Sequence, residues 1–544
     1  MNVNQLSSSD VNAGSHTGAH PRAFAPGTLL LLLALSIFGA IVGVQLLTTL
    51  GVTPNTSIIG AMMAMIVARI PLQSMARFRS VHIQNLAQSA TSAATFGAAN
   101  SLLLPIAIPW LFGRQDLVMP MFFGVALAML LDGYMLYRLF NTRIFPAEGA
   151  WPPGIAVAES IKAGDKGGRQ AGLLGIGIAI GVFGAWLKFP IAALGTAFIG
   201  NIWALAMLGI GFLLRGYSLP LLGVDINQHY IPHGIMAGAG VVALFQIIKL
   251  MRNRDGGGSA VNQTQTQALS ASQGEAIGKT MRLGAVGFIV ISALIALGSG
   301  LFSQMSLPWI LAFVLYAALA AFLHEVIVGL AAMHSGWFPA FAVALITLLI
   351  GILIGFPPEA LVMLCGFSAA TGPAFADMGY DLKAGFILRG RDSVSRFELE
   401  GRKQQLLAAL LAFVVAIPVV FFIYREYFSA GLVPPVAKVY VAAIQAGVSP
   451  DIAKSLLLWA IPGALIQLIG GPGRQMGVLL ATGLLINNPL AGWAVMIGIL
   501  IRVVVLRVKG DAARNLMEVL AAGLIAGDAL FSFFNSMLSP GRKK

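Results

Sequence analysis

Long runs without a charged residue are the feature that most limits what this chain of 544 residues can fold into. A helix that crosses a bilayer needs about 20 mostly apolar residues. Several runs reach that length, and some are long enough for two crossings: Ala23–Ala68, Leu283–Leu323, Val326–Pro358, Gln404–Tyr424 and Gln475–Ile501. The sequence therefore predicts an all-α polytopic membrane protein.

The composition agrees with this prediction and excludes a soluble protein. Hydrophobic residues make up 58% of the chain and charged residues 10%, with a mean hydropathy of +0.85. The 63 glycines and 26 prolines are scattered through the apolar runs, which indicates close helix packing and interrupted helices. The single cysteine, Cys365, lies in an apolar run and is expected to pack there. Small residues four positions apart occur at Gly39 and Gly43, Gly177 and Gly181, Gly351 and Gly355, and Gly523 and Gly527.

The net charge of +13 does not indicate a nucleic-acid partner, because the basic residues form short clusters between apolar runs. Such clusters are typical of loops on the cytoplasmic side of a membrane. We therefore expect both termini to be cytoplasmic. The clusters near the C-terminus contain Arg507, Lys509, Arg514 and Arg542–Lys544.

Four segments follow from the pattern of apolar and polar stretches. The N-terminal segment is polar, and we expect it to be a disordered tail with His16 and His20 exposed. The interior polar stretch is rich in Gly, Ser, Gln and Thr and is expected to be a flexible cytoplasmic linker. The predicted segments are the tail 1–25, a first transmembrane repeat 26–250, the linker 251–281 and a second transmembrane repeat 282–544.

Each half contains eight predicted crossings when interrupted segments are counted, which gives about 16 transmembrane helices. From Leu221 an apolar stretch is followed by a break that contains Asn and then by a second apolar stretch. The same order is found from Leu479. An even count in each half predicts two parallel repeats with discontinuous helices. A second apparent echo joins Trp151–Gln170 to Ala376–Gln405, since both contain an acidic residue before Lys-Ala-Gly.

One apolar segment, His82–Trp110, carries a polar stripe. A polar stripe at membrane depth must face another helix or a cavity. The two interpretations are hydrogen-bonded helix packing and a half-helix that lines a substrate path. Pro105 and Pro109 predict a break near its end. The stripe contains Asn85, Ser89, Ser92 and Asn100, with Gln88, Thr91 and Thr95 beside them.

Six acidic residues lie in or beside the apolar segments. A charged side chain at a helix centre costs about 2.5–3.5 kcal/mol on insertion scales, so each needs a partner or a task. One interpretation is proton carriage, and the other is ion pairing with Lys162, Lys383 or neighbours. Glu159 follows a Trp-Pro-Pro-Gly break, where a carboxylate has room to meet substrate. The six are Asp132, Glu159, Glu325, Asp377, Asp381 and Asp528.

The sequence predicts neither a metal site nor a cofactor. His229 and His233 have the spacing of a metal pair, but Pro232 separates them and no third ligand is local. His324-Glu325 begins like the zinc motif HExxH, yet Val328 replaces its second histidine. A nucleotide-binding P-loop is also missing from the sequence. His82 and His334 are either ordinary hydrogen-bonded histidines or contacts to substrate.

Several stretches of the sequence resemble a known family. The chain is similar to the oligopeptide transporter (OPT) family, which includes the yellow stripe-like metal-chelate transporters, and most closely to its bacterial branch. The matching pieces are WPPGIAVAESIKAG, HIQNLAQSATSAATFGAANSLLLP, ADMGYDLKAGFILRG with GRKQQ, and AAGLIAGDAL. The resemblance implies about sixteen transmembrane segments, two domains that move relative to one another, and proton-coupled uptake of small peptides or metal chelates.

The chain departs from the family pattern where many members carry a Ser-Asn-Asn-Pro-like break and this sequence has Met333–Pro339. The break is kept while its polar side chains differ, so the substrate class stays open. We expect proton coupling at Glu159, Asp377, Asp381 and Asp528. We expect substrate binding at Asn85, Gln88, Ser92, Asn100, Glu159, His334, Trp337 and Asn487.

The leading hypothesis is a proton-coupled secondary transporter that imports small oligopeptides through a bacterial cytoplasmic (inner) membrane. The first alternative is uptake of peptide-like metal chelates or siderophores by the same fold. A more distant alternative is a membrane-embedded enzyme or lipid-handling protein. Expected partners are the substrate, protons and the lipid bilayer, and the sequence is compatible with a homo-oligomer.

Overall fold

The computed structural model describes most of the chain. The second part of the apolar run Ala23–Ala68, from residue 52 on, lies outside the described residues, as do His16 and Trp337. The described residues are 19–51, 78–149, 151–165, 168–254, 266–335, 340–391, 395–447, 450–471, 474–510 and 512–538.

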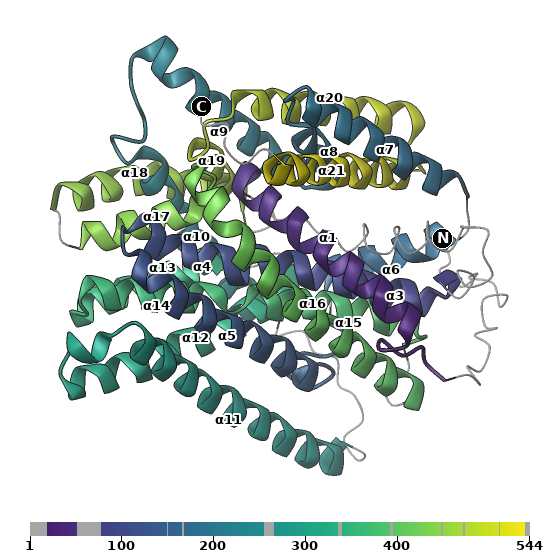
Figure 1. Cartoon of the computed structure of the whole chain (residues 1–544), viewed down its shortest axis with the longest axis horizontal. Coiled ribbons are helices and arrows are strands. Elements are labelled where there is room, and N and C mark those ends of the chain that lie inside the picture. The colour runs from purple at the N-terminus through teal and green to yellow at the C-terminus, as the bar shows by residue number, and fades with distance from the viewer. Residues whose placement is uncertain are drawn as a thin grey trace.

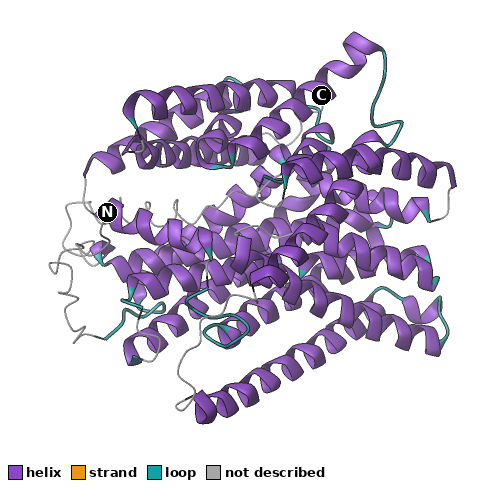
Figure 2. Ribbon diagram, turned by 180° about the vertical axis from the view of Figure 1, so that it is seen from behind, coloured by secondary structure: helices purple, strands orange, loops and turns teal. Residues whose placement is uncertain are grey.

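Regular structure in these residues is helical throughout, as Figure 2 shows. Within the described residues, 10 helices are long and apolar enough to cross a membrane, and three shorter helices are also apolar. The all-α polytopic membrane fold is confirmed. The full number of about sixteen crossings stays a prediction.

The helices form two bundles, and each bundle contains helices from both halves of the chain (Figure 1). The larger bundle carries the main apolar core. Its elements are α1 (Pro26–Leu50), α3 (Val81–Phe96), the π-helical η2 (Gly97–Leu103), α4 (Leu104–Leu111), α5 (Val118–Leu139), α6 (Pro152–Asp165), α11 (Thr266–Gly298), α12 (Leu307–Ser335), α13 (Ala340–Ile354), α14 (Pro358–Ala370), α15 (Pro373–Leu388), α16 (Arg396–Ser429) and α17 (Pro435–Ala446).

The smaller bundle has separate apolar clusters. Helix α1 lies between the bundles, because Phe38, Val42 and Leu46 pack on the smaller one while Leu35 and Val44 pack on the larger. The smaller bundle contains α7 (Gly168–Trp186), α8 (Ile191–Ile199), α9 (Ile202–Leu222), α10 (Ile231–Arg254), α18 (Pro450–Gly470), α19 (Met476–Leu484), α20 (Pro489–Lys509) and α21 (Ala512–Leu538). Two short 3₁₀ turns, η3 (Gln115–Leu117) and η5 (Leu301–Ser303), complete the elements.

An internal repeat relates α3–α10 to α14–α21. Each series begins with an interrupted span of 31 residues, 81–111 and 358–388. Helices α8 and α19 have nine residues each, and α9 and α20 have 21 each. Asn201 and Asn488 both cap the following helix, because each side-chain oxygen accepts a backbone N–H of its first turn. The Leu479 segment therefore corresponds to α8 and α9, not to the segment from Leu221.

The sequence similarity between Trp151–Gln170 and Ala376–Gln405 does not come from this internal repeat. In the repeat, the counterpart of α6 is α17, since both begin at a proline and end in Ile-x-Ala-Gly. The segment Ala376–Gln405 instead belongs to α15 and α16. Its Lys-Ala-Gly sequence packs beside α6, where a Cβ added to Gly154 would lie 2.8 Å from the Cβ of Lys383.

Equivalent helices that touch one another run antiparallel. In α9 and α20, Gly209 lies against Val495, whereas Gly216 lies against Pro489. The same reversed order joins α5 to α16 and joins the two interrupted spans. A two-fold axis along the helices would give equivalent helices the same direction. The arrangement therefore fits inverted repeats, not the parallel repeats that the sequence predicted.

The two ends of the predicted linker are helical. Helix α10 continues to Arg254, and α11 already begins at Thr266. Residues 255–265 between them lie outside the described part of the chain. The division into two repeats at this linker stays a prediction.

The segment before α1 is folded, which corrects the expected disordered tail for residues 19–25. His20 is 4% exposed and Ala23 is fully buried. The Ala23 N–H donates to the Gln404 side-chain oxygen of α16 at 2.7 Å. The His20 ring lies 5.3 Å from the ring of His82 and 5.1 Å from that of Phe397. Contacts with distant helices therefore bury a histidine that was expected to be exposed.

Glycines with small-residue spacing bring α7 and α21 into close contact. A Cβ added to Gly181 would lie 2.9 Å from the Gly527 Cα, and one added to Gly177 would lie 2.9 Å from the Gly523 Cα. The two motifs that the sequence identified thus face each other, as expected of small residues at a membrane helix interface.

We predict that Gly181→Ala lowers the thermal unfolding midpoint of the detergent-purified protein, because the methyl group would separate α7 from α21. Overpacking of this kind costs about 1–3 kcal/mol. Gly175→Ala is the matched control on the same helix, since no atom lies within 4 Å of its added Cβ. Equal midpoints for the two variants would contradict the close contact.

We predict that acid releases the segment 19–25. Burial lowers the pKa of His20 from 6.5 to about 4, although its hydrogen bond to the Pro21 carbonyl opposes the shift. The neutral ring stabilises the docked segment above pH 6.5, and this stabilisation is lost as the pH falls from 6.5 toward about 4. The opening is measured as the labelling rate of Ala23→Cys with a thiol reagent that is active in acid.

His20→Phe keeps an aromatic ring but cannot titrate. In the His20→Phe background, the labelling rate of the cysteine at position 23 should not rise on acidification. The same acid-dependent rise with either residue at position 20 would show that another group controls the segment.

Candidate functional site

The polar stripe of α3 meets two aspartates on α15. Ser92 donates to Asp377 at 2.6 Å, and Gln88 donates to Asp381. All four residues are buried, with at most 1% exposure. The aspartates lie four residues apart, so they occupy one face of α15. The structure brings together four of the predicted site residues from different halves of the chain.

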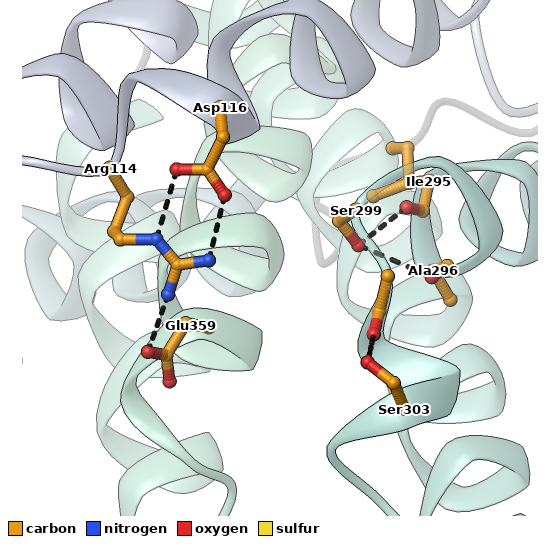
Figure 3. A network of polar contacts seen from close by, with 8 residues as sticks. Arg114, Asp116, Ile295, Ala296, Ser299, Ser303 and Glu359 are labelled. Atoms are coloured by element: carbon orange, nitrogen blue, oxygen red, sulfur yellow. Dashed lines mark hydrogen bonds and ion pairs between the residues drawn. The ribbon is translucent and has the colours of Figure 1, made fainter.

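The antiparallel packing of the two interrupted spans places these groups opposite each other. At the far end of the pair, Arg114 follows α4 and Glu359 begins α14. Arg114 donates to Glu359 at 2.7 Å and to both carboxylate oxygens of Asp116 at 2.7 and 3.0 Å (Figure 3). This ion-pair group aligns one end of the two spans. Beside it, Figure 3 shows the Ser299 hydroxyl at the end of α11, which donates to the Ile295 carbonyl at 2.7 Å.

Gln405 of α16 joins both spans. Its amide nitrogen donates to the Asp381 carbonyl at 2.7 Å and to the Ser89 hydroxyl at 3.0 Å. Its amide oxygen accepts from Arg389 at 2.8 Å. Arg389 in turn holds Glu398 by two hydrogen bonds, of 2.6 and 3.1 Å. The side chains of this ion pair are 0% and 1% exposed, so the basic group is buried.

Lys383 does not pair with Asp381. Its ammonium donates to the Ala147 carbonyl at 2.7 Å and lies 4.0 Å from Glu148. The ion-pair interpretation of Asp381 and Lys383 is therefore wrong for the described residues. The positive charge is held on the opposite side by the chain that precedes α6.

Several buried polar atoms around the aspartates lack a hydrogen-bond partner among the described residues. They include both amide atoms of Asn85, one carboxylate oxygen each of Asp377 and Asp381, and the Tyr380 hydroxyl. Buried polar atoms normally have partners. This group can therefore accept protons or a polar ligand, and it defines the candidate site.

The helix α6 covers α15 near this site. Trp151 is fully buried, its backbone N–H donates to the Met333 carbonyl at 2.8 Å, and its ring lies 6.1 Å from that of Tyr380. Glu159 belongs to α6 and follows the buried pair Val157 and Ala158. The Glu159 side chain lies outside what the structure describes.

The other predicted site residues are not gathered here. Asn100 is half-buried in η2, and Asn487 is exposed in the loop before α20. Asp528 lies in the smaller bundle, where its carboxylate accepts the Ala192 N–H at 3.0 Å and so caps α8. His334 ends α12, and its side chain, like Trp337, lies outside the described residues.

The site contains residues that the sequence did not nominate. Tyr380, Arg389 and Gln405 were not among the predicted site residues. A glutamine at the start of an apolar run was the available signal for Gln405. Within the described residues no group of three or more His, Cys, Asp or Glu side chains is placed to hold a metal ion.

Comparison with protein families identifies the chain. The family model described as OPT oligopeptide transporter protein matches residues 26–247 and 217–539. The chain belongs to the oligopeptide transporter family. It is therefore a membrane transport protein, not an enzyme. No curated protein sequence matches it.

We predict that Gln405→Leu lowers the thermal unfolding midpoint of this transporter. The substitution leaves buried hydrogen-bonding groups of Asp381, Ser89 and Arg389 without a partner, and each such group costs about 1–3 kcal/mol. Lys403→Leu is the control, because Lys403 is exposed on the same helix. If Gln405→Leu were as stable as the control, the network would contribute nothing to the fold.

Proposed function

We propose that the chain is a proton-coupled importer of small oligopeptides in which Asp377 and Asp381 bind the coupling protons. The observation that carries the proposal is the pair of buried aspartates on one face of α15, each with one hydrogen bond from α3 and one oxygen without a partner among the described residues. Membership of the family supports peptide-like substrates.

Repulsion between Asp377 and Asp381 can couple proton binding to substrate binding. Two ionised carboxylates one helical turn apart repel each other in a low-dielectric interior. A proton or the ammonium group of a peptide relieves this repulsion. Protonation therefore favours the closed, dry arrangement, and the ionised pair favours an open arrangement in which water or a substrate amine reaches it.

Neighbouring polar groups complete the proposed site. Asn85 offers an amide to the peptide backbone, and the Tyr380 hydroxyl offers a second hydrogen bond. We also assign Glu159 to proton coupling or amine binding, because α6 packs directly on α15. Asn100, His334, Trp337 and Asn487 remain proposed substrate contacts along the path, and Asp528 remains a proposed proton-coupling group.

The proposed setting is a bacterial cytoplasmic membrane with both termini on the cytoplasmic side. Basic residues at the end of α20 and the start of α21 support this orientation, among them Arg507, Lys509 and Arg514. The functional unit is proposed to be this chain alone or a homo-oligomer of it.

Transport by purified protein in liposomes tests the proposal. A pH gradient of about one unit provides about 1.4 kcal/mol per proton, which supports about tenfold accumulation. We predict that the protein accumulates radiolabelled trialanine against its gradient. In Asp381→Asn, accumulation should be lost while trialanine exchange across the membrane continues, because exchange moves no net proton. Glu426→Gln, which changes an exposed acid of α16, should behave as wild type.

The same assay separates the alternatives. Loss of both accumulation and exchange in Glu159→Gln would assign that acid to amine binding, whereas loss of accumulation alone would assign it to proton coupling. Uptake of a ferric peptide chelate without uptake of trialanine would replace peptides by chelates as substrate. Normal accumulation in both Asp377→Asn and Asp381→Asn would refute the assigned proton site.

A further inference from the structure

A second pair of buried acids lies at the break between α14 and α15. Asp132 of α5 and Glu325 of α12 are both 0% exposed. Asp132 accepts the backbone N–H of Gly372 at 3.2 Å through one oxygen. Its other oxygen, and both oxygens of Glu325, have no hydrogen-bond partner among the described residues. His324, the residue before Glu325, contacts Thr371, and Asp132 binds the adjacent Gly372, so the helices bring both acids to the same break.

The basic groups on the surrounding helices are committed elsewhere. His324 contacts the Thr371 hydroxyl at 3.3 Å and the Ala340 carbonyl at 2.8 Å. No cation is bound to either acid within the described residues. Among the described side chains, the basic groups on these helices include Arg402 of α16, which holds Glu398 and the Phe140 carbonyl; Lys383 of α15, which holds the Ala147 carbonyl; and His233 of α10. Those exposed at the surface include Arg138 of α5, Lys279 and Arg282 of α11, and Arg396, Lys403 and Arg425 of α16.

The remaining titratable groups on the packed helices cannot neutralise the pair. They include the acids Asp377 and Asp381 of α15, which receive hydrogen bonds from α3; Glu359 of α14, which binds Arg114; Glu398, Glu400 and Glu426 of α16; Cys365 of α14; the tyrosines Tyr134 and Tyr137 of α5, Tyr316 of α12 and Tyr380 of α15; and Glu159 and Lys162 of α6, of which Lys162 is exposed. Two buried carboxylates without a cation would carry a charge of minus two in an apolar interior, which is far more costly than one shared charge.

A proton is the ligand that fits these atoms. Divalent cations such as Ca²⁺ and Mg²⁺ take about six or more oxygen ligands, and this pair offers three free carboxylate oxygens. The hydroxyl of Thr371, the residue before Gly372, already donates to the Ala321 and Ser368 carbonyls at 3.1 and 3.0 Å. The Gly372 N–H favours an ionised Asp132, so Glu325 is the member that carries the proton.

The break itself depends on Asp132. Gly372 precedes the first residue of α15 and has φ +98, a conformation that suits glycine. Asp132 therefore places a negative charge at the N-terminus of α15, where the helix dipole favours it. The same helix carries Asp377 and Asp381. A change of charge at the break is thus linked by one rigid element to the proposed substrate site.

We propose that Asp132 and Glu325 form a second protonation site, in which Glu325 holds a proton while Asp132 stays ionised, and that this site sets the geometry of the α14–α15 break. With the proton bound, α5 and α12 stay together around Gly372. When the proton leaves, repulsion between the two anions separates them and reorients α15. The site is independent of the substrate's identity, so its protonation can be measured without any substrate.

Infrared difference spectroscopy of the purified, detergent-solubilised protein tests this proposal. We expect a C=O stretch of a protonated carboxyl group that persists at neutral pH and disappears as the pH is raised. Glu325→Gln should remove this band, and Asp132→Asn should shift the pH at which it disappears. Glu426→Gln, at an exposed position on α16, is the control and should leave the band unchanged.

Wild-type protein with ¹³C-labelled glutamate gives a second measurement that needs no substitution, since the band should move to lower frequency. Reaction of Glu325 with an apolar carbodiimide, located by peptide mass spectrometry, should fall as the band is lost. A band unaffected by Glu325→Gln, or unmoved by labelling of glutamate, would overturn the proposal. Loss of the band on addition of Na⁺ or K⁺ at constant pH would also overturn it and assign the site to a metal cation.

Discussion

The hydrogen bonds between the polar stripe of α3 and the aspartates of α15 are the interaction on which the larger bundle depends. In an apolar interior, water does not compensate a polar group that lacks a protein partner. Gln88 and Ser92 can be buried because α15 supplies Asp381 and Asp377. The aspartates can be buried for the same reason. Each span would be unfavourable in lipid without the other, so they must pack together.

The inverted arrangement makes this pairing possible. Because the two interrupted spans run antiparallel, the first half of one lies beside the second half of the other, and the ion pair of Arg114 and Glu359 closes the opposite end. Gln405 then extends the network to α16. A site built this way contains groups from both halves of the chain. A relative movement of its helices therefore changes the environment of the acids directly.

The sequence located many of these groups but not their partners. The spacing on α3 revealed the stripe, and the cost of burial singled out Asp377, Asp381, Asp132 and Glu325. Which acid meets which amide depends on the direction and register of helices hundreds of residues apart. The similarity between Trp151–Gln170 and Ala376–Gln405 suggests a repeat, but α6 and α15, which contain these segments, are neighbours in space and not repeat equivalents. Of the two adjacent asparagines, only Asn488 is seen to cap α20, and Asn487 stays a predicted substrate contact.

Local sequence by itself determined the class of protein and the positions of its helices, since apolar length, proline and glycine act over a few residues. The sequence also determined that each buried acid must have a hydrogen-bonding partner or a functional role. Tertiary structure alone decided that His20 is buried, that Lys383 turns away from Asp381, and that equivalent spans run antiparallel. These outcomes depend on groups brought together by packing, whose energies are absent from any single stretch of chain. The substrate site is therefore a property of the assembled bundle, because its acids and their hydrogen-bond donors meet only there.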